Sequence, residues 1–388
     1  MAYTSYDRLG ASLMHKEADR ITFDFGGTLQ TGINNKAYRA LRDYLGLPER
    51  DIEIADTLQQ LAKVDQDVIE RLQVDVETIY PGAPDTKGHC SDITEDTRYY
   101  YWTDEWGISW KMPKGYGLYF DIMSAPLAGI DTLAGIKDYY FPYGADPGRF
   151  RSMKEDTDAC VNERKKGCIL GRHYAGIFET ASWLRGLENF FCDMAANPGF
   201  AEGLLDIVTE NKIEYWTEAL KASGDAPQVI SEADDVAMQN GLMISKEMYR
   251  RILKPRHKRL CETIRKRAGR HVGIFFHCCG AMKELIPDFV EAGFDIFNPI
   301  QVSAAGMDTK ELKRDFGKDI TFWGGGCESQ HILPRGTVQE VKDEVKRRID
   351  DLAPGGGFVF ASIHNIQADV PPENMVAMWE AFQENCKY

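Results

Sequence analysis

Short apolar runs alternate with longer amphipathic segments through most of the chain, most regularly after residue 167. The apolar runs predict strands at Val74–Ile79, Cys168–Gly171, Gln228–Ser231, Val272–His277, Phe294–Asn298, Ile320–Trp323 and Phe358–Ala361. The segments between them have helical periodicity and predict helices at Ser182–Ala196, Ala201–Ala222, Lys246–Arg267, Met282–Ala292, Thr309–Phe316, Val338–Leu352 and Glu373–Glu384. Such alternation is typical of a parallel sheet covered by helices.

The number of strands and the length of the chain favour a (β/α)8 TIM barrel over an open doubly wound sheet. Seven strands are recognisable, and we expect the eighth near Phe23, in a short apolar run that ends in a Gly-Gly turn. No Gly-x-Gly-x-x-Gly motif follows a predicted strand, which argues against a dinucleotide-binding sheet.

Two segments interrupt this pattern. Residues 1–73 have mainly helical and loop character, so we expect an N-terminal helical extension ahead of a barrel domain at residues 74–388. Residues 83–166 are rich in tyrosine and tryptophan, and we expect an insertion of hairpins and loops. This insertion has three interpretations: a second small core, a lid, or a surface for a partner.

Composition narrows the function classes. The net charge of −14 argues against nucleic acid and anionic membranes as partners. Residues 1–20 lack the apolar core of a signal peptide, and no apolar run reaches about 18 residues, so we expect a cytoplasmic protein without membrane spans. The odd number of cysteines, nine, argues against a secreted disulfide framework. The sequence leaves a homodimer open.

Polar residues gather where the predicted strands end, which is the catalytic edge of such barrels. His277 and Cys279 are two positions apart, so both side chains can face one ion while Cys278 points away. Cys327 follows a later strand after three glycines. One imidazole and two thiolates with an open fourth position predict a catalytic zinc site at His277, Cys279 and Cys327. The alternative is three reduced residues in a polar pocket.

Other polar residues at this edge allow two interpretations each. Glu179 lies in a nearly uncharged stretch, which favours a buried carboxylate that completes the zinc shell or donates a proton. Asp234 and Asp235 follow a strand and are equally suited to capping a helix. His364 suits a hydrogen-bonded core position as well as a site.

Several motifs resemble uroporphyrinogen decarboxylase-like proteins. They are spread through nearly the whole chain and include Arg8-Leu9-Gly10-Ala11, Gly176-Ile177-Phe178-Glu179, Asp234-Asp235, His277-Cys278-Cys279-Gly280, Asn298-Pro299 and His364-Asn365-Ile366. The resemblance implies a distorted TIM barrel with an N-terminal extension. The arginine-rich signature of the decarboxylases is not recognisable, since Phe23-Asp24-Phe25-Gly26-Gly27-Thr28 stands in its place.

The zinc- and cobamide-dependent methyltransferases of that superfamily carry a His-x-Cys…Cys site, which His277, Cys279 and Cys327 resemble. The aromatic insertion and the Trp323-Gly-Gly-Gly segment favour the branch that moves a methyl group from a methoxylated aromatic to the Co(I) cobamide of a corrinoid protein. The alternatives are a methylcobamide:thiol methyltransferase of coenzyme M type, a decarboxylase, and a non-catalytic scaffold with structural zinc.

The resemblance also suggests roles for the remaining polar and aromatic residues. In the demethylase interpretation, zinc polarises the ether oxygen, and the catalytic candidates that hydrogen-bond or protonate the leaving oxygen are Glu179, Asp235 and His364. The candidates for substrate binding are Tyr174, Trp183, Asp234, Asn298, Trp323 and Asn365.

Overall fold

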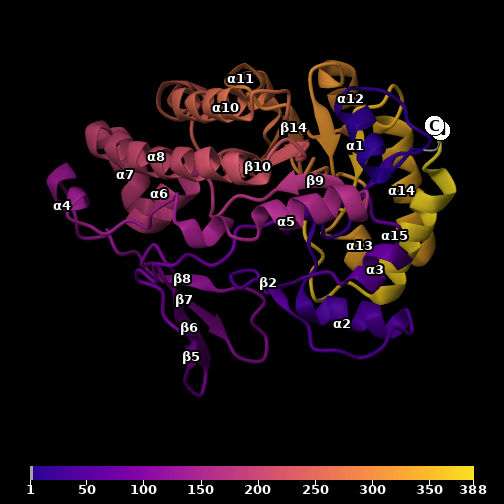
Figure 1. The fold of residues 1–388 in the computed structure, drawn as a ribbon, viewed down its shortest axis with the longest axis horizontal. Helices are drawn as coiled ribbons and strands as arrows, with labels where there is room; N and C mark the ends of the chain where they lie inside the picture. Colours follow the sequence, from indigo (N-terminus) through magenta and orange to yellow (C-terminus); the bar gives the residue numbers. More distant parts are fainter. Residues whose placement is uncertain (1–2) are drawn as a thin grey trace.

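The computed structural model describes residues 3–388 and contains a (β/α)8 barrel, which confirms the predicted fold class (Figure 1). Its eight strands are parallel, in the order β1-β16-β15-β14-β13-β10-β9-β4. They are β1 (Thr22–Phe23), β4 (Val76–Ile79), β9 (Gly167–Leu170), β10 (Val229–Ala233), β13 (Gly273–His277), β14 (Ile296–Asn298), β15 (Thr321–Trp323) and β16 (Phe358–Phe360). The eighth strand is β1, at the expected place.

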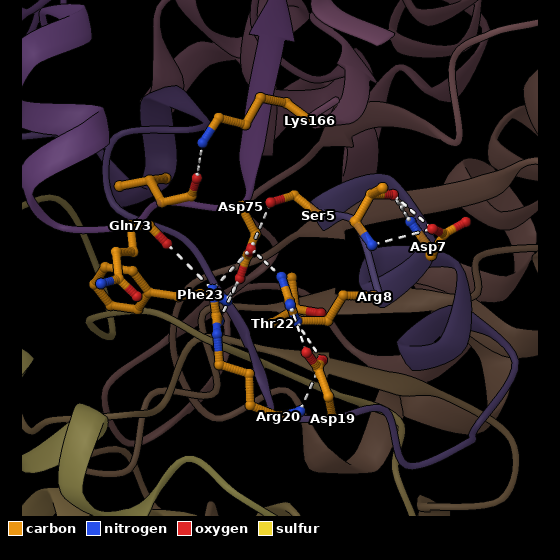
Figure 2. A network of polar contacts seen from close by, with 12 residues as sticks. Ser5, Asp7, Arg8, Asp19, Arg20, Thr22, Phe23, Gln73, Asp75 and Lys166 are labelled. Carbon is orange, nitrogen blue, oxygen red and sulfur yellow. Dashed lines mark hydrogen bonds and ion pairs between the residues drawn. The ribbon is translucent and has the colours of Figure 1, made fainter. Parts of the chain in front are cut away.

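Asp75 joins the two ends of this sheet, as Figure 2 shows. Its backbone N–H donates to the Phe23 carbonyl at 2.9 Å, and its carboxylate accepts from the Phe23 N–H at 2.8 Å. The same carboxylate, which is fully buried, also accepts from Arg8 and Arg20, each at 2.6 Å. A further bond from Ser5, at 2.7 Å, ties the first helix to the seam. The barrel is therefore closed by one side chain as much as by backbone pairing.

Side chains alternate between the barrel interior and the outer helices. Phe275 lies in the interior with Leu9 of the first helix and Trp323 of β15. Phe276 points the other way and stacks on Phe294, with ring centroids 4.1 Å apart. This alternation fixes the direction of His277, which is the last residue of β13.

Helices surround the barrel, and α1 lies across its amino-terminal end (Figure 1). The helices are α1 (Ser5–Leu13), α2 (Asn35–Tyr44), α3 (Gln66–Arg71), α4 (Leu133–Lys137), α5 (Met153–Asp158), α6 (Ile177–Arg185), α7 (Leu187–Ala196), α8 (Pro198–Ser223), α9 (Lys246–Met248), α10 (Lys254–Ala268), α11 (Ile286–Ala292), α12 (Thr309–Phe316), α13 (Ile332–Arg335), α14 (Val338–Leu352) and α15 (Pro372–Asn385). The ranges predicted for α12 and α14 match these bounds. Thr337 and Glu340 form a capping box at the start of α14.

One predicted helix, Ser182–Ala196, differs from the structure. The chain forms α6 and α7 instead, separated by Gly186 at φ +84°. Helix α6 also begins five residues earlier, at Ile177, because the carboxylate of Asp234 accepts from the N–H groups of its first turn. A cap supplied by a distant residue cannot be read from the local sequence.

The aromatic segment contains a four-stranded antiparallel sheet that projects from the barrel at the lower left of Figure 1. Its strands are β5 (Thr94–Glu95), β6 (Tyr99–Thr103), β7 (Ser109–Pro113) and β8 (Asp121–Ser124). Two small antiparallel pairs lie elsewhere: β2 (Ile54–Asp56) with β3 (Leu61–Ala62), and β11 (Ala237–Met238) with β12 (Gly241–Leu242). The domain boundary at residue 73 stays a prediction, and β1 contributes to the barrel from within those first residues.

Within residues 3–388, no helix has the length and apolar character needed to cross a membrane.

Candidate functional site

Two histidines and one cysteine meet at the carboxyl-terminal end of the barrel. One ligand atom from each of His277, Cys279 and His364 lies within 4.8 Å of the others. The Cys279 Sγ is 3.4 Å from the His277 Nε2. His277 ends β13, Cys279 follows two residues later, and His364 follows β16. The parallel strands therefore bring three soft or borderline ligand atoms to one mouth.

An asparagine fixes the ring orientation of each histidine. The Asn298 Oδ1 lies 2.5 Å from the Nδ1 of His277, and the Asn365 Oδ1 lies 2.8 Å from the Nδ1 of His364. Asn298 donates its amide N–H to a carbonyl of β15 at 2.9 Å, and Asn365 donates to Gln59 at 2.7 Å. Because both amide oxygens must accept, each Nδ1 carries the proton, and both Nε2 lone pairs are left for a ligand.

The electrostatics of this group suit a metal cation. Burial lowers the pKa of His277 well below its ordinary value and lowers that of His364, so both rings are neutral near pH 7. Burial, with the nearby charge of Asp235, raises the pKa of Cys279 well above its ordinary value. A buried thiol of this kind ionises readily only when a cation stabilises the thiolate. Two neutral imidazoles and one thiol form a donor set that fits zinc.

Cys327 is not in this group. It is fully buried in the outer core, where its thiol lies 3.9 Å from the carbonyl of Glu328. Burial raises its pKa, and charges on Glu344 and Arg348 of α14 also act on it. Gly324 and Gly325, with φ of +90° and +75°, turn the chain after β15, so the two-residue alternation of the strand does not continue to Cys327.

Glu179 lies at the same mouth, on the first turn of α6. Its carboxylate accepts from the Gly176 N–H at 3.1 Å. Burial, together with the charges of Asp235 and Asp234, raises the pKa of Glu179 to about 8. This side chain is therefore a neutral acid near pH 7 that holds a transferable proton.

The two aspartates after β10 differ in their contacts. Asp234 is fully buried and accepts from Phe178 at 2.8 Å, Glu179 at 2.9 Å and His257 at 2.9 Å. It caps α6 and so positions Glu179. Asp235 accepts from the N–H of Cys279 at 2.7 Å and fixes the backbone that carries the thiol.

Two of the residues predicted to bind substrate, Tyr174 and Trp183, join the aromatic insertion to the barrel. The hydroxyl of Tyr174 donates to Asp104, which also accepts from the indole N–H of Trp110 at 2.8 Å. Trp183 packs edge-on against Trp110, with ring centroids 5.4 Å apart. These aromatic side chains therefore hold the small sheet against α6.

Trp323 is fully buried in the barrel interior and packs edge-on against Phe275, with centroids 5.4 Å apart. Its indole N–H donates to Asp24 at 2.7 Å. Trp323 therefore belongs to the floor below the mouth.

Two residues at the mouth were not among the sequence candidates. Arg172 follows β9 and is partly buried, and its charge acts on the pKa of Glu179 and His277. Tyr119 belongs to the insertion, and the charges of Asp369 and Cys279 act on its pKa, which burial raises. Arg172 could have been found from its position directly after a strand. Tyr119 had no local signal, because the insertion places it.

Comparisons with known proteins agree with this fold. A methylated-thiol–coenzyme M methyltransferase of Methanosarcina mazei is 24% identical over 210 residues, 53% of this chain and 51% of the relative. A uroporphyrinogen decarboxylase of Citrifermentans bemidjiense is 27% identical over 188 residues, 48% of this chain and 49% of the relative. The chain thus spans about half the length of the curated relatives it matches.

A solved structure described as a methyltransferase from Methanosarcina mazei shares the fold, with a TM-score of 0.62 and 20% identity over 98% of this chain and 99% of that chain. The family model described as uroporphyrinogen decarboxylase (URO-D) matches residues 118–385. Because that match covers more than half of the sequence, the chain belongs to the uroporphyrinogen decarboxylase (URO-D) family.

Proposed function

We propose that this protein is a zinc-dependent methyltransferase that moves a methyl group from a methoxylated aromatic compound to the Co(I) cobamide of a corrinoid protein. The observation that carries the proposal is the group formed by His277, Cys279 and His364, with the acid Glu179 at the same mouth. Both a methyltransferase and decarboxylases occur among its relatives, and the metal-binding character of this group supports methyl transfer.

We place the metal at His277, Cys279 and His364, with His364 in place of the cysteine expected from the sequence, because these three side chains offer ligand atoms close together. Zinc bound there would supply Lewis-acid polarisation of the ether oxygen. The bond between the methyl carbon and that oxygen breaks, the oxygen keeps the electron pair, and the methyl group passes to the partner's cobalt.

The residues of this chain prepare the leaving oxygen and its surroundings. Glu179 holds a proton near pH 7 and is suited to deliver it to the phenolate oxygen as the bond breaks. Asn298 and Asn365 keep both imidazole rings in one orientation, so no reorganisation is needed when the substrate binds. Tyr119 of the insertion is partly buried, and the charge of Cys279 acts on its pKa, which makes it a candidate for covering the bound substrate.

A second candidate is methyl transfer involving a thiol, and the methylated-thiol–coenzyme M methyltransferase among the relatives favours it. In that reaction the metal site would activate a thiol in place of an ether oxygen. The same three side chains serve both reactions, so activity has to separate them.

Metal analysis tests the site. We expect about one zinc per chain in the wild type, and loss of most of it in the variants Cys279→Ala and His364→Ala. Cys327→Ala is the matched control, because it also removes a buried thiol, and we expect it to keep its zinc. Zinc lost from Cys327→Ala and kept by His364→Ala would contradict the assignment.

Activity tests the reaction. The protein would be mixed with a Co(I) corrinoid protein and 3,4-dimethoxybenzoate, and the visible spectrum followed for methyl-Co(III). Appearance of that spectrum with the aromatic ether supports demethylation. Methyl transfer with thiols alone supports the second candidate, and absence of both reactions refutes the proposal.

A further inference from the structure

Arg172 occupies a position at the mouth that the proposed mechanism leaves unused. Leu170, at the end of β9, pairs with Ile79 of β4 on one side and Ile230 of β10 on the other. Arg172 comes two residues after the end of this strand, beyond the paired residues. Its guanidinium faces the side-chain amide of Gln30, in the segment that follows β1, and its charge acts on the pKa of both His277 and Glu179. The guanidinium therefore lies at the mouth, near the group formed by His277, Cys279 and His364.

The partner of this guanidinium is neutral. The amide oxygen of Gln30 faces Arg172 and accepts from its two terminal nitrogens at 2.7 and 2.5 Å. Within residues 3–388, Arg172 has no carboxylate at ion-pair distance. Other buried arginines do have one, namely Arg8 with Asp75, Arg42 with Asp67, Arg149 with Glu105, Arg185 with Asp193 and Arg348 with Glu344.

The acidic groups that face Arg172 leave its charge available. Asp56 and Asp235 are near enough for the guanidinium to act on their pKa values, yet both lie beyond ion-pair distance. Glu179, the third, is protonated near pH 7 because its pKa is about 8. A partly buried guanidinium held by an amide alone favours an incoming anion, since a charge removed from water gains most from a paired opposite charge.

We propose that Arg172, held in place by Gln30, binds a carboxylate group on the substrate. The inference rests on the proposed function and deepens it: the substrate class becomes a methoxylated benzoate, in contrast to a neutral methoxybenzene. The planar fork of an arginine matches a carboxylate in two parallel hydrogen bonds, which fixes the ring plane as well as its position. Arg172 then determines specificity at one end of the aromatic ring of the substrate, and the group formed by His277, Cys279 and His364 lies at the other end.

Binding measurements test this without any corrinoid protein. Calorimetric titration of the zinc-loaded protein would compare 3,4-dimethoxybenzoate with 3,4-dimethoxybenzamide, which has nearly the same shape and no charge. For a charge-assisted pair, we expect the wild type to bind the benzoate about 10–100-fold more tightly. In Arg172→Gln we expect the two ligands to bind within about threefold of each other.

Arg314→Gln is the matched control, because Arg314 lies exposed on the outer helix α12, and we expect it to retain the wild-type preference. A merely structural role for Arg172 would weaken both ligands equally. Equal binding of both ligands by the wild type, binding of neither, or a preference that survives in Arg172→Gln would each overturn the inference. A carboxylate preference without methyl transfer would support Arg172 binding and refute only the proposed function.

Discussion

Replacing Asp75 with asparagine tests how the barrel is closed. The substitution keeps the size of the side chain and removes its charge. In the wild type, the fully buried carboxylate accepts from two arginines, Arg8 and Arg20, whose side chains are only 8% and 16% exposed. It also accepts from the N–H of Phe23 across the seam between β1 and β4 (Figure 2). In Asp75→Asn, both guanidinium groups lose their shared counter-charge in a place where water cannot replace it.

The size of the effect follows from that burial. Removing one partner from a buried ion pair costs about 3–5 kcal/mol. An unfolding entropy of about 2.1 cal/mol/K per residue amounts to about 0.8 kcal/mol/K for 388 residues. A loss of about 4 kcal/mol therefore lowers the Tm by about 5 °C. Differential scanning calorimetry of the purified protein measures both quantities.

Asp19→Asn is the matched control. Asp19 also pairs with Arg8, at 2.8 Å, but its side chain is 46% exposed, so water replaces much of the lost interaction. We expect a cost below about 1 kcal/mol and a Tm within about 1 °C of the wild type. Equal destabilisation by the two variants would refute this explanation, because the burial of Asp75 between β1 and β4 would then make no difference to the stability.

Four further substitutions test the mouth of the barrel and its surroundings. Asn298→Ala should weaken zinc binding about 10–100-fold in a chelator competition, because the ring of His277 loses the acceptor that orients it. The rate of methyl transfer should be constant below about pH 8 and fall about tenfold per pH unit above it, because Glu179 loses its proton there. Glu179→Gln should lower the rate about 10²–10⁴-fold and abolish the fall in rate above about pH 8. Asp104→Asn should speed proteolysis within residues 83–166, because Asp104 joins Tyr174 to Trp110, and unchanged cleavage would contradict that role. His364→Cys should keep one zinc per chain and slow ether demethylation, and an unchanged rate would show that the charge of the donor set does not matter.

The pattern of apolar and polar residues was enough to predict most strands of the barrel. Each of these strands is an apolar run, and it ends where helical periodicity or a turn begins. The strand β1 was harder to define, since Thr22 and Phe23 alone form it and Asp75, far along the chain, secures it. The start of α6 was missed for a related reason. Its cap is Asp234, which only the tertiary structure brings to the helix.

The same distinction between local and distant contacts decides which residues of the site could be predicted from the sequence. His277 and Cys279 were expected on one side of the chain because strand alternation is a local rule, and the structure brings them together. Strand alternation does not continue through the turn at Gly324 and Gly325, so the direction of the Cys327 side chain could not be predicted. The part played by His364 depends on Asn365 and Gln59, which hold its ring toward the mouth.

The presence of His364 in place of a second cysteine bears on the choice between the two candidate reactions. Two imidazoles and one thiolate leave a divalent cation with a net charge of about +1, whereas one imidazole and two thiolates leave it neutral. In a site screened from water, that difference in charge strongly affects a bound oxygen. A positive site stabilises the negative charge that develops on a phenolate, which helps an aryl ether to release its methyl group. The same charge makes a bound thiolate a weaker nucleophile, because its electron pair is held more tightly. A divalent cation held by His277, Cys279 and His364 would therefore favour the proposed ether demethylation over alkylation of a thiol.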